Sequence, residues 1–96
     1  MEETHEASAR EFTVQNRMGI HTRPAAQIVR LANRYPDCEI TVSKDDESVN
    51  GKSIMGLMML AAGKGETIKV ITDGADAEAA MTDLEELVSS GFGDVE

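Results

Sequence analysis

The sequence predicts an α+β fold: an open-faced two-layer sandwich in the order β-α-β-β-α-β-α, with a four-stranded antiparallel sheet covered on one face by three helices. Three observations support this class. Short segments alternate apolar and polar residues, as strands with one buried face do. Other segments repeat apolar residues at helical spacing, and the connections between them are short. The 96 residues give room for one domain, and a hydrophobic fraction of 41% can form one modest core.

The first strand and the first helix are expected before residue 36. Phe12 and Val14 alternate with polar neighbours, which indicates a strand. From Thr22 the spacing becomes helical, and Pro24 fits there because a first-turn N–H has no intrahelical acceptor. The residues that share the apolar face are Ala25, Ile28, Val29 and Ala32. Residues 35–37 end the helix, since the residue before a proline avoids the helical region.

Three more strands and two more helices are expected in the rest of the chain. The strands lie at 38–42, around 48–50 and at 67–72, separated by polar or glycine-containing turns. Ser53 can cap a short helix, and Asp76 can cap the last one. The last helix has the clearest apolar stripe, formed by Ala77, Ala80, Met81, Leu84, Leu87 and Val88.

The predicted domain organisation is simple. Residues 1–8 are polar and acidic without a period, which indicates a flexible N-terminal extension. Residues 9–90 form the single domain, and residues 91–96 are expected as a C-terminal tail beyond Gly91. A core of this size can stand alone, so we expect a monomer.

Composition excludes several classes of partner. The formal charge of −9 argues against binding a nucleic acid through its phosphates. All the arginines (Arg10, Arg17, Arg23, Arg30, Arg34) lie in the first part of the chain, which predicts a local positive face for an anion or an acidic partner. A single cysteine fits a reducing cytoplasm, and no apolar run predicts membrane insertion. Cys38 and two distant histidines do not make a metal site.

His21 is the candidate reactive residue. It precedes the first helix, where free backbone N–H groups and the helix dipole favour an anion. Gly19 allows a tight turn ahead of it, Arg23 can reach the same anion, and Pro24 fixes the first turn. A phosphoryl acceptor needs an unprotonated nitrogen and such donors around it. The competing interpretation is an ordinary exposed histidine in a loop, and the residues alone leave both open.

Two motifs resemble one known family. Residues 19–26, reading GIHTRPAA, resemble the active-site signature of HPr, the histidine-containing phosphocarrier family of the bacterial phosphoenolpyruvate:sugar phosphotransferase system. Residues 50–60, reading NGKSIMGLMML, resemble the family's second signature, around its regulatory serine. The resemblance extends from near Arg10 to near Ser90, and the family's open-faced sandwich has the element order predicted here.

The resemblance implies a function. It implies that enzyme I phosphorylates His21 on Nδ1, that the group passes to the EIIA domains of sugar permeases, and that Arg23 supports the phosphohistidine. Both chemical steps then belong to partners, so a carrier is expected rather than an enzyme, with no cofactor. It also implies regulatory phosphorylation of Ser53 by a serine kinase/phosphorylase, with a transcriptional regulator as a further partner. Ser53 can serve as a cap as well, because a helix N-terminus tolerates a phosphate.

A contact patch is expected beside His21. The apolar residues of the short helix cannot all point inward, and methionine suits a surface that meets several partners in turn. The residues expected in this patch are Ile20, Thr22, Ile54 and Met55.

Two alternatives remain open. The first is a purely regulatory HPr-like module that acts through Ser53 on a transcription factor or enzyme; in such members of the family the active-site histidine is replaced, whereas His21 is present here. The second is a ferredoxin-like small-molecule sensor, which shares the order β-α-β-β-α-β but leaves His21 and Arg23 unexplained. Labelling by a phosphoenolpyruvate-driven donor separates the carrier from both alternatives.

Overall fold

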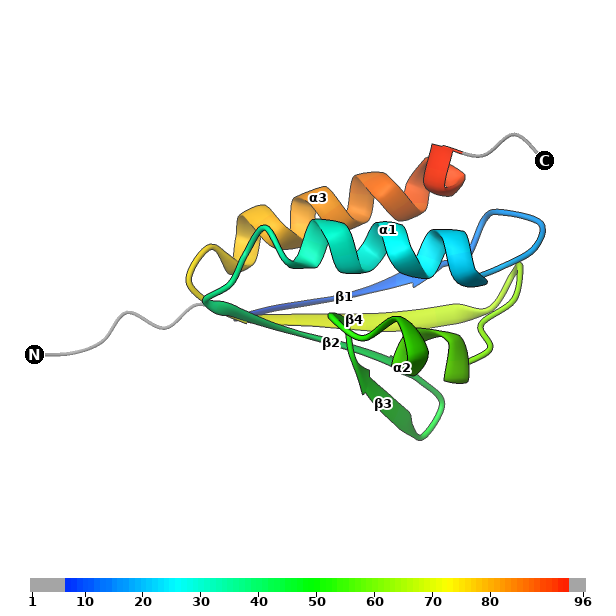
Figure 1. Ribbon diagram of the computed structural model, residues 1–96, viewed down its shortest axis with the longest axis horizontal. Helices are drawn as coiled ribbons and strands as arrows, with labels where there is room; N and C mark the ends of the chain where they lie inside the picture. The colour runs from blue at the N-terminus through cyan, green and yellow to red at the C-terminus, as the bar shows by residue number, and fades with distance from the viewer. Residues whose placement is uncertain (1–6, 94–96) are drawn as a thin grey trace, which may run out of the picture.

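The computed structural model describes residues 7–93, and its elements follow the predicted order (Figure 1). The strands are β1 (Ala7–Thr13), β2 (Cys38–Lys44), β3 (Glu47–Asn50) and β4 (Thr67–Gly74). The helices are α1 (Thr22–Ala32), α2 (Ile54–Met59) and α3 (Ala77–Ser89). A short 3-10 turn, η1 (Gly91–Gly93), follows α3.

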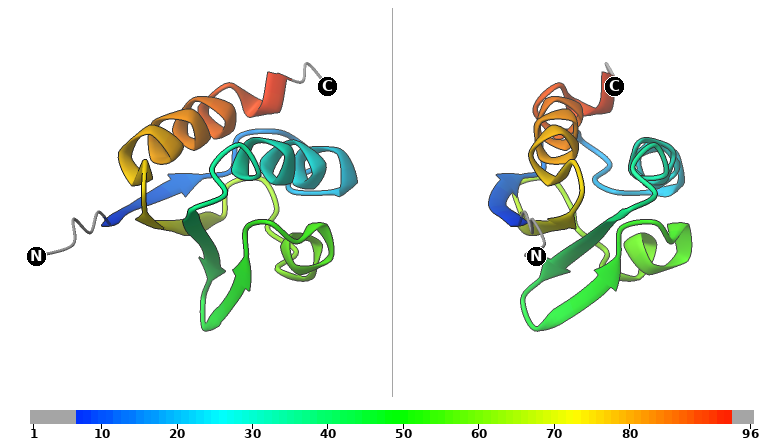
Figure 2. Two further views of the ribbon diagram at one scale, coloured as in Figure 1. Left: turned by 60° about the vertical axis from the view of Figure 1, so that its left-hand side comes forward. Right: turned by 90° about the vertical axis from the view of Figure 1, so that its left-hand side faces the viewer.

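The four strands form one antiparallel sheet in the order β1-β4-β2-β3. Val42 of β2 lies between Val70 of β4 and Val49 of β3, so apolar residues align across the sheet. All three helices lie on the same side of the sheet, as the end-on view in Figure 2 shows, and the other face is left open. The predicted open-faced sandwich is confirmed.

The core lies between the sheet and the helices. Along β2 the residues Cys38, Ile40 and Val42 are buried while their neighbours point to the open face, which is the period of two expected of a half-buried strand. Helix α1 contributes Ala25 and Ile28 at helical spacing. The remaining large core residues are Leu57, Ile68, Val70, Met81, Leu84, Val88 and Phe92.

The sheet begins earlier than the sequence indicates. Ala7 pairs with Asp73 and Ser8 with Thr72, so the last two residues of the predicted extension belong to β1. Backbone pairing needs no alternation of side chains, and the small residues at this end of β1 gave no such pattern. Residues 1–6 lie outside the described residues.

Phe92 belongs to the core, which corrects the predicted tail. Its ring is fully buried although its backbone is left-handed (φ 62°), and Gln27 of α1 donates from Nε2 to its carbonyl oxygen at 3.2 Å. Gly91, also left-handed, turns the chain at the end of α3, and an apolar residue just after such a glycine commonly folds back onto its helix. The fold therefore extends to η1.

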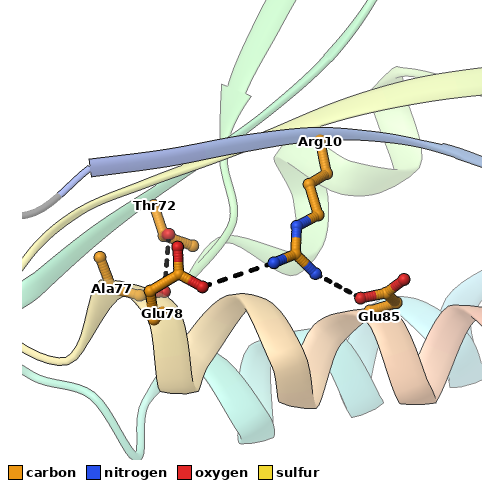
Figure 3. Close-up of polar contacts among 5 residues, drawn as sticks. All are labelled: Arg10, Thr72, Ala77, Glu78 and Glu85. Carbon is orange, nitrogen blue, oxygen red and sulfur yellow. Dashed lines mark hydrogen bonds and ion pairs between the residues drawn. The ribbon is translucent and has the colours of Figure 1, made fainter.

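Polar contacts join β1 and β4 to α3 (Figure 3). Arg10 of β1 forms ion pairs with Glu78, at 3.4 Å, and with Glu85. The buried Thr72 hydroxyl donates to the carbonyl oxygen of Ala77 at 2.8 Å. Asp76 occupies the N-cap position of α3, but its backbone is left-handed (φ 64°) and its side chain makes no capping hydrogen bond, so the predicted cap is wrong. A side chain caps from an extended backbone, and the turn from β4 does not provide one.

Replacement of Phe92 tests whether η1 is part of the fold. We expect Phe92→Ala to lower the free energy of unfolding by about 3–5 kcal/mol, because it removes a fully buried ring and leaves a cavity. Phe92→Leu, which keeps most of the buried apolar volume, should lose less. The measurement is urea unfolding followed by circular dichroism. A loss below about 1 kcal/mol for Phe92→Ala would contradict burial of this residue in solution.

Candidate functional site

The loop between β1 and α1 is held in place by its own backbone and by the segment after α2. Asn16 is buried and donates from Nδ2 to the carbonyl oxygen of Gly19 at 2.7 Å. The N–H of Ile20 donates to the carbonyl oxygen of Ala62 at 2.9 Å. Gly19 is left-handed (φ 71°), and a Cβ there would lie 2.4 Å from the same oxygen. Only glycine combines this backbone conformation with so close an approach.

The segment after α2, which contacts Gly19, is itself held by hydrogen bonds. The carboxylate of Glu66 accepts from the N–H of Gly63 at 2.7 Å and from Nζ of Lys44 at 3.2 Å. These two partners, the backbone N–H first, lower the pKa of Glu66 below its usual value. The N–H of Val14 donates to the carbonyl oxygen of Glu66, and the carbonyl oxygen of Val14 accepts from the N–H of Gly65, both at 2.9 Å. The segment just after β1 thus holds the turn just before β4.

His21 is the N-cap of α1. Its backbone is extended (φ −96°, ψ −162°), its carbonyl oxygen accepts from the N–H of Ala25 at 3.0 Å, and its own N–H donates to Gly19 at 3.0 Å. The half-buried imidazole makes no capping hydrogen bond. The position that a serine or aspartate usually fills for stability is thus occupied by a side chain left available for chemistry.

The first turn of α1 is suited to an anion. It contains no acidic residue, so the positive end of the helix dipole is not offset by a carboxylate. Pro24 is buried and fixes the backbone there, while Thr22 and Arg23 are exposed. A phosphoryl group on the imidazole would lie next to these residues. His21, Thr22 and Arg23 are consecutive at the start of α1, and a shared role for them around a phosphoryl group stays a prediction.

Helix α2 lies beside the start of α1. Ser53 is its N-cap and accepts from the N–H of Gly56 through Oγ at 3.0 Å, which confirms the predicted capping role. The hydroxyl of Thr22 donates to the sulfur of Met58 at 3.7 Å, so the two helices meet close to His21. Leu57 is the buried residue of α2. The exposed ones, which we call the α2 apolar surface, are Ile54, Met55, Met58 and Met59.

Ile20 is not part of this surface, which corrects one predicted contact residue. Its side chain is only 4% exposed and packs in the core, while its backbone binds Ala62. The reason is the turn at Gly19: it directs the next side chain toward the sheet and leaves His21 outside. Thr22, Ile54 and Met55, the other predicted contact residues, are exposed.

Sequence reasoning missed Asn16 and Ala62. Asparagine at position 16 indicates only a turn. No local pattern predicts that its side chain is buried and bound to the carbonyl oxygen of Gly19. Ala62 lies in a turn far along the chain and contributes through its backbone, which has no sequence signature.

Other kinds of site have little support in the described part of the chain. Among residues 7–93, no three histidine, cysteine or acidic side chains are placed to hold a metal ion. None of the helices in that range is long and apolar enough to cross a membrane.

The chain is similar to known proteins over most of its length. Residues 8–90 match the family described as "PTS HPr component phosphorylation site". The chain is 46% identical to phosphocarrier protein HPr of Pseudomonas aeruginosa over 85 residues, which cover 88% of this chain and 93% of that protein. It is 48% identical over 75 residues to the HPr-like protein Crh of Halalkalibacterium halodurans, covering 78% and 88% of the two chains. The crystal structure of HPr-C-His from Thermoanaerobacter tengcongensis matches with a TM-score of 0.87 at 37% identity, over 93% of this chain and 99% of that one.

The close approach of Gly19 to Ala62 gives a testable difference between two glycines. Gly19→Ala introduces left-handed strain and a contact of 2.4 Å, whereas Gly65→Ala introduces the strain alone, since Gly65 (φ 87°) has no atom within 4 Å of the added Cβ. We expect Gly65→Ala to lower the free energy of unfolding by about 1–2 kcal/mol and Gly19→Ala by clearly more. Urea unfolding measures both. Equal losses would show that the loop does not rest on Ala62.

Proposed function

Since the chain belongs to the HPr family of phosphocarriers, we propose that Nδ1 of His21 accepts a phosphoryl group from enzyme I and passes it to EIIA domains of sugar permeases. The observation that carries this proposal is the imidazole at the N-cap of α1, which no capping hydrogen bond occupies. The proposal places the chain in the cytoplasm. The phosphoryl group that it carries originates from phosphoenolpyruvate. The monomer expected from the sequence stays a prediction.

The reaction needs little from the carrier itself. The lone pair of Nδ1 attacks phosphorus in line, the new N–P bond forms, and the bond to the donor breaks with its electron pair returning to the donor. The second transfer reverses these roles toward the next acceptor. A carrier must hold the group without stabilising it too much, and the positive end of a short helix provides moderate stabilisation of the added oxygens. No second catalytic group is required on this chain, so it acts as a carrier and the partners act as enzymes.

Arg23 is proposed to support the phosphoryl group. It lies on the same helical turn as the acceptor, exposed, two residues after His21. A guanidinium donates in a planar fork that matches phosphate oxygens. Because the side chain is on the surface, its loss should affect transfer more than folding.

Labelling with enzyme I and phosphoenolpyruvate tests the proposal. We expect one phosphoryl group per chain, lost in acid and retained in base, as is typical of a phosphohistidine. His21→Ala should take no label while unfolding at a similar urea concentration, and Arg23→Ala should be labelled about ten- to a hundredfold more slowly. Mass measurement reports the label. Full labelling of His21→Ala would exclude this residue as the acceptor, and a wild-type rate in Arg23→Ala would exclude its supporting role.

Ser53 is proposed as a regulatory phosphorylation site. Its Oγ caps α2, and the α2 apolar surface begins at the next residue, Ile54. A phosphate there is favoured by the helix N-terminus, so the fold tolerates it. The partner that covers this surface would have to desolvate the added charge, which is unfavourable unless a cation meets it. A serine kinase/phosphorylase and a transcriptional regulator are the further partners that this role requires.

Two replacements of Ser53 separate its roles. Ser53→Ala should lower the free energy of unfolding by about 1 kcal/mol, because the cap is lost, and leave the labelling rate nearly unchanged. Ser53→Asp should keep the cap and slow labelling of His21 by enzyme I. Thermal unfolding and initial labelling rates are the measurements. If Asp changes neither quantity, Ser53 lies outside the interface; if Asp slows labelling only as far as it destabilises the fold, Ser53 is a cap alone.

A second candidate function is a purely regulatory module that acts through Ser53 on a transcription factor or enzyme. The similarity to the HPr-like protein Crh favours it. The presence of His21 at an open N-cap favours the carrier instead. The labelling experiment separates the two, because a purely regulatory module takes no phosphoryl group from enzyme I.

A further inference from the structure

Helix α2 is unusual in how many thioethers it exposes. It has six residues and no charged side chain. Met55 is 70% exposed and Met59 75%, while Met58 is 40% exposed. Met81, in α3, is 0% exposed. The methionines of the described chain thus divide into accessible ones around the candidate site and a shielded one in the core.

Exposed thioethers have a chemistry that leucine or isoleucine would not have. Methionine is apolar, but its sulfur can be oxidised to a sulfoxide, which is polar and a strong hydrogen-bond acceptor. We propose that Met55, Met58 and Met59 are a modification site for hydrogen peroxide, and that their oxidation slows phosphorylation of His21. The second half of this inference rests on the proposed function.

The oxidation step needs only peroxide as co-reactant. A sulfur lone pair attacks one peroxide oxygen, the S–O bond forms and the O–O bond breaks. The departing hydroxide takes up the proton of the transferred hydroxyl group and leaves as water. Sulfur is oxidised by two electrons and peroxide is reduced by two. Methionine sulfoxide reductases reverse the change with two electrons from thiols, which become a disulfide while the oxygen leaves as water, so the modification is reversible.

Met58 connects this chemistry to His21. Its sulfur accepts the hydroxyl hydrogen of Thr22 at 3.7 Å, and Thr22 is the residue next to His21 in the first turn of α1. A thioether is a weak acceptor, whereas a sulfoxide oxygen is a strong one and extends beyond the sulfur. Oxidation would place a partial negative charge beside the turn that has to receive phosphoryl oxygens. It would also make the α2 apolar surface polar where an incoming protein has to displace water.

The fold predicts which groups are spared. Met81 is shielded by the core. Cys38 is buried as well, and burial raises the pKa of its thiol, so little of the peroxide-reactive thiolate is present. Met18 is 63% exposed on the loop that carries His21, but it lies outside α2 and provides a comparison.

The experiment treats the full chain with hydrogen peroxide, removes the peroxide, and then adds enzyme I and phosphoenolpyruvate. Peptide mapping by mass spectrometry locates each added oxygen. We expect sulfoxides at Met55, Met58 and Met59, none at Met81, and initial labelling about tenfold slower than in the untreated chain. Thermal unfolding of the treated chain should be nearly unchanged.

Two variants test which methionines cause the slower labelling. The labelling rate of each variant is compared before and after peroxide treatment. In the triple variant M55L/M58L/M59L, peroxide should leave the labelling rate unchanged. In M18L the full slowing should remain. The inference is overturned if α2 is oxidised without slowing, if the triple variant is slowed as much as the wild type, or if Met81 is oxidised in parallel with loss of the fold. If the untreated chain takes no label, the proposed function is overturned, and so is the slowing of His21 phosphorylation by oxidation. The map of sulfoxides tests the modification site independently of that outcome.

Discussion

The position of His21 depends on one close backbone contact, between the loop before α1 and the turn after α2. The carbonyl oxygen of Ala62 accepts from Ile20, and the missing side chain of Gly19 makes that approach possible. The contact sends Ile20 into the core and leaves the imidazole outside, at the positive end of α1. It also brings α2 next to the first turn of α1, so that one surface includes the acceptor residue and the apolar residues beside it.

Helix α2 shows a balance between stability and exposure. One fully buried residue, Leu57, and the cap at Ser53 hold a helix of only six residues. A helix this short is marginal by itself, so its packing against α1 and β3 has to stabilise it. Exposing several large apolar side chains adds nothing to that stability. The chain is acidic overall, but the α2 apolar surface contains no charged side chain. A partner that covers this surface would displace water from it without desolvating a charge of α2.

Much of the fold could be predicted because its signals are local. Alternation over residues 38–42, helical spacing from Thr22 and the cap at Ser53 each depend on neighbours in the chain. The errors fall where tertiary packing or the conformation of a turn decides the outcome. Gly91 ends the last helix, so the sequence indicates a tail after it, but the ring of Phe92 is buried in the core and its carbonyl oxygen accepts from Gln27 of α1. Asp76 has a good capping side chain, but the left-handed turn from β4 prevents its use.

By itself, the sequence predicted the order of the elements, His21 as the candidate acceptor with Arg23 two residues after it, and Ser53 as a helix cap. These follow from residue type and spacing within a single turn, where an α-helix leaves its first N–H groups without intrahelical partners. Only the tertiary structure decided that Ile20 is buried, that Asn16 and Ala62 hold the loop, and that Thr22 reaches Met58. Each of these contacts either joins segments that lie far apart in the chain or depends on a backbone hydrogen bond. Neither kind of contact produces a periodic pattern in the amino-acid sequence.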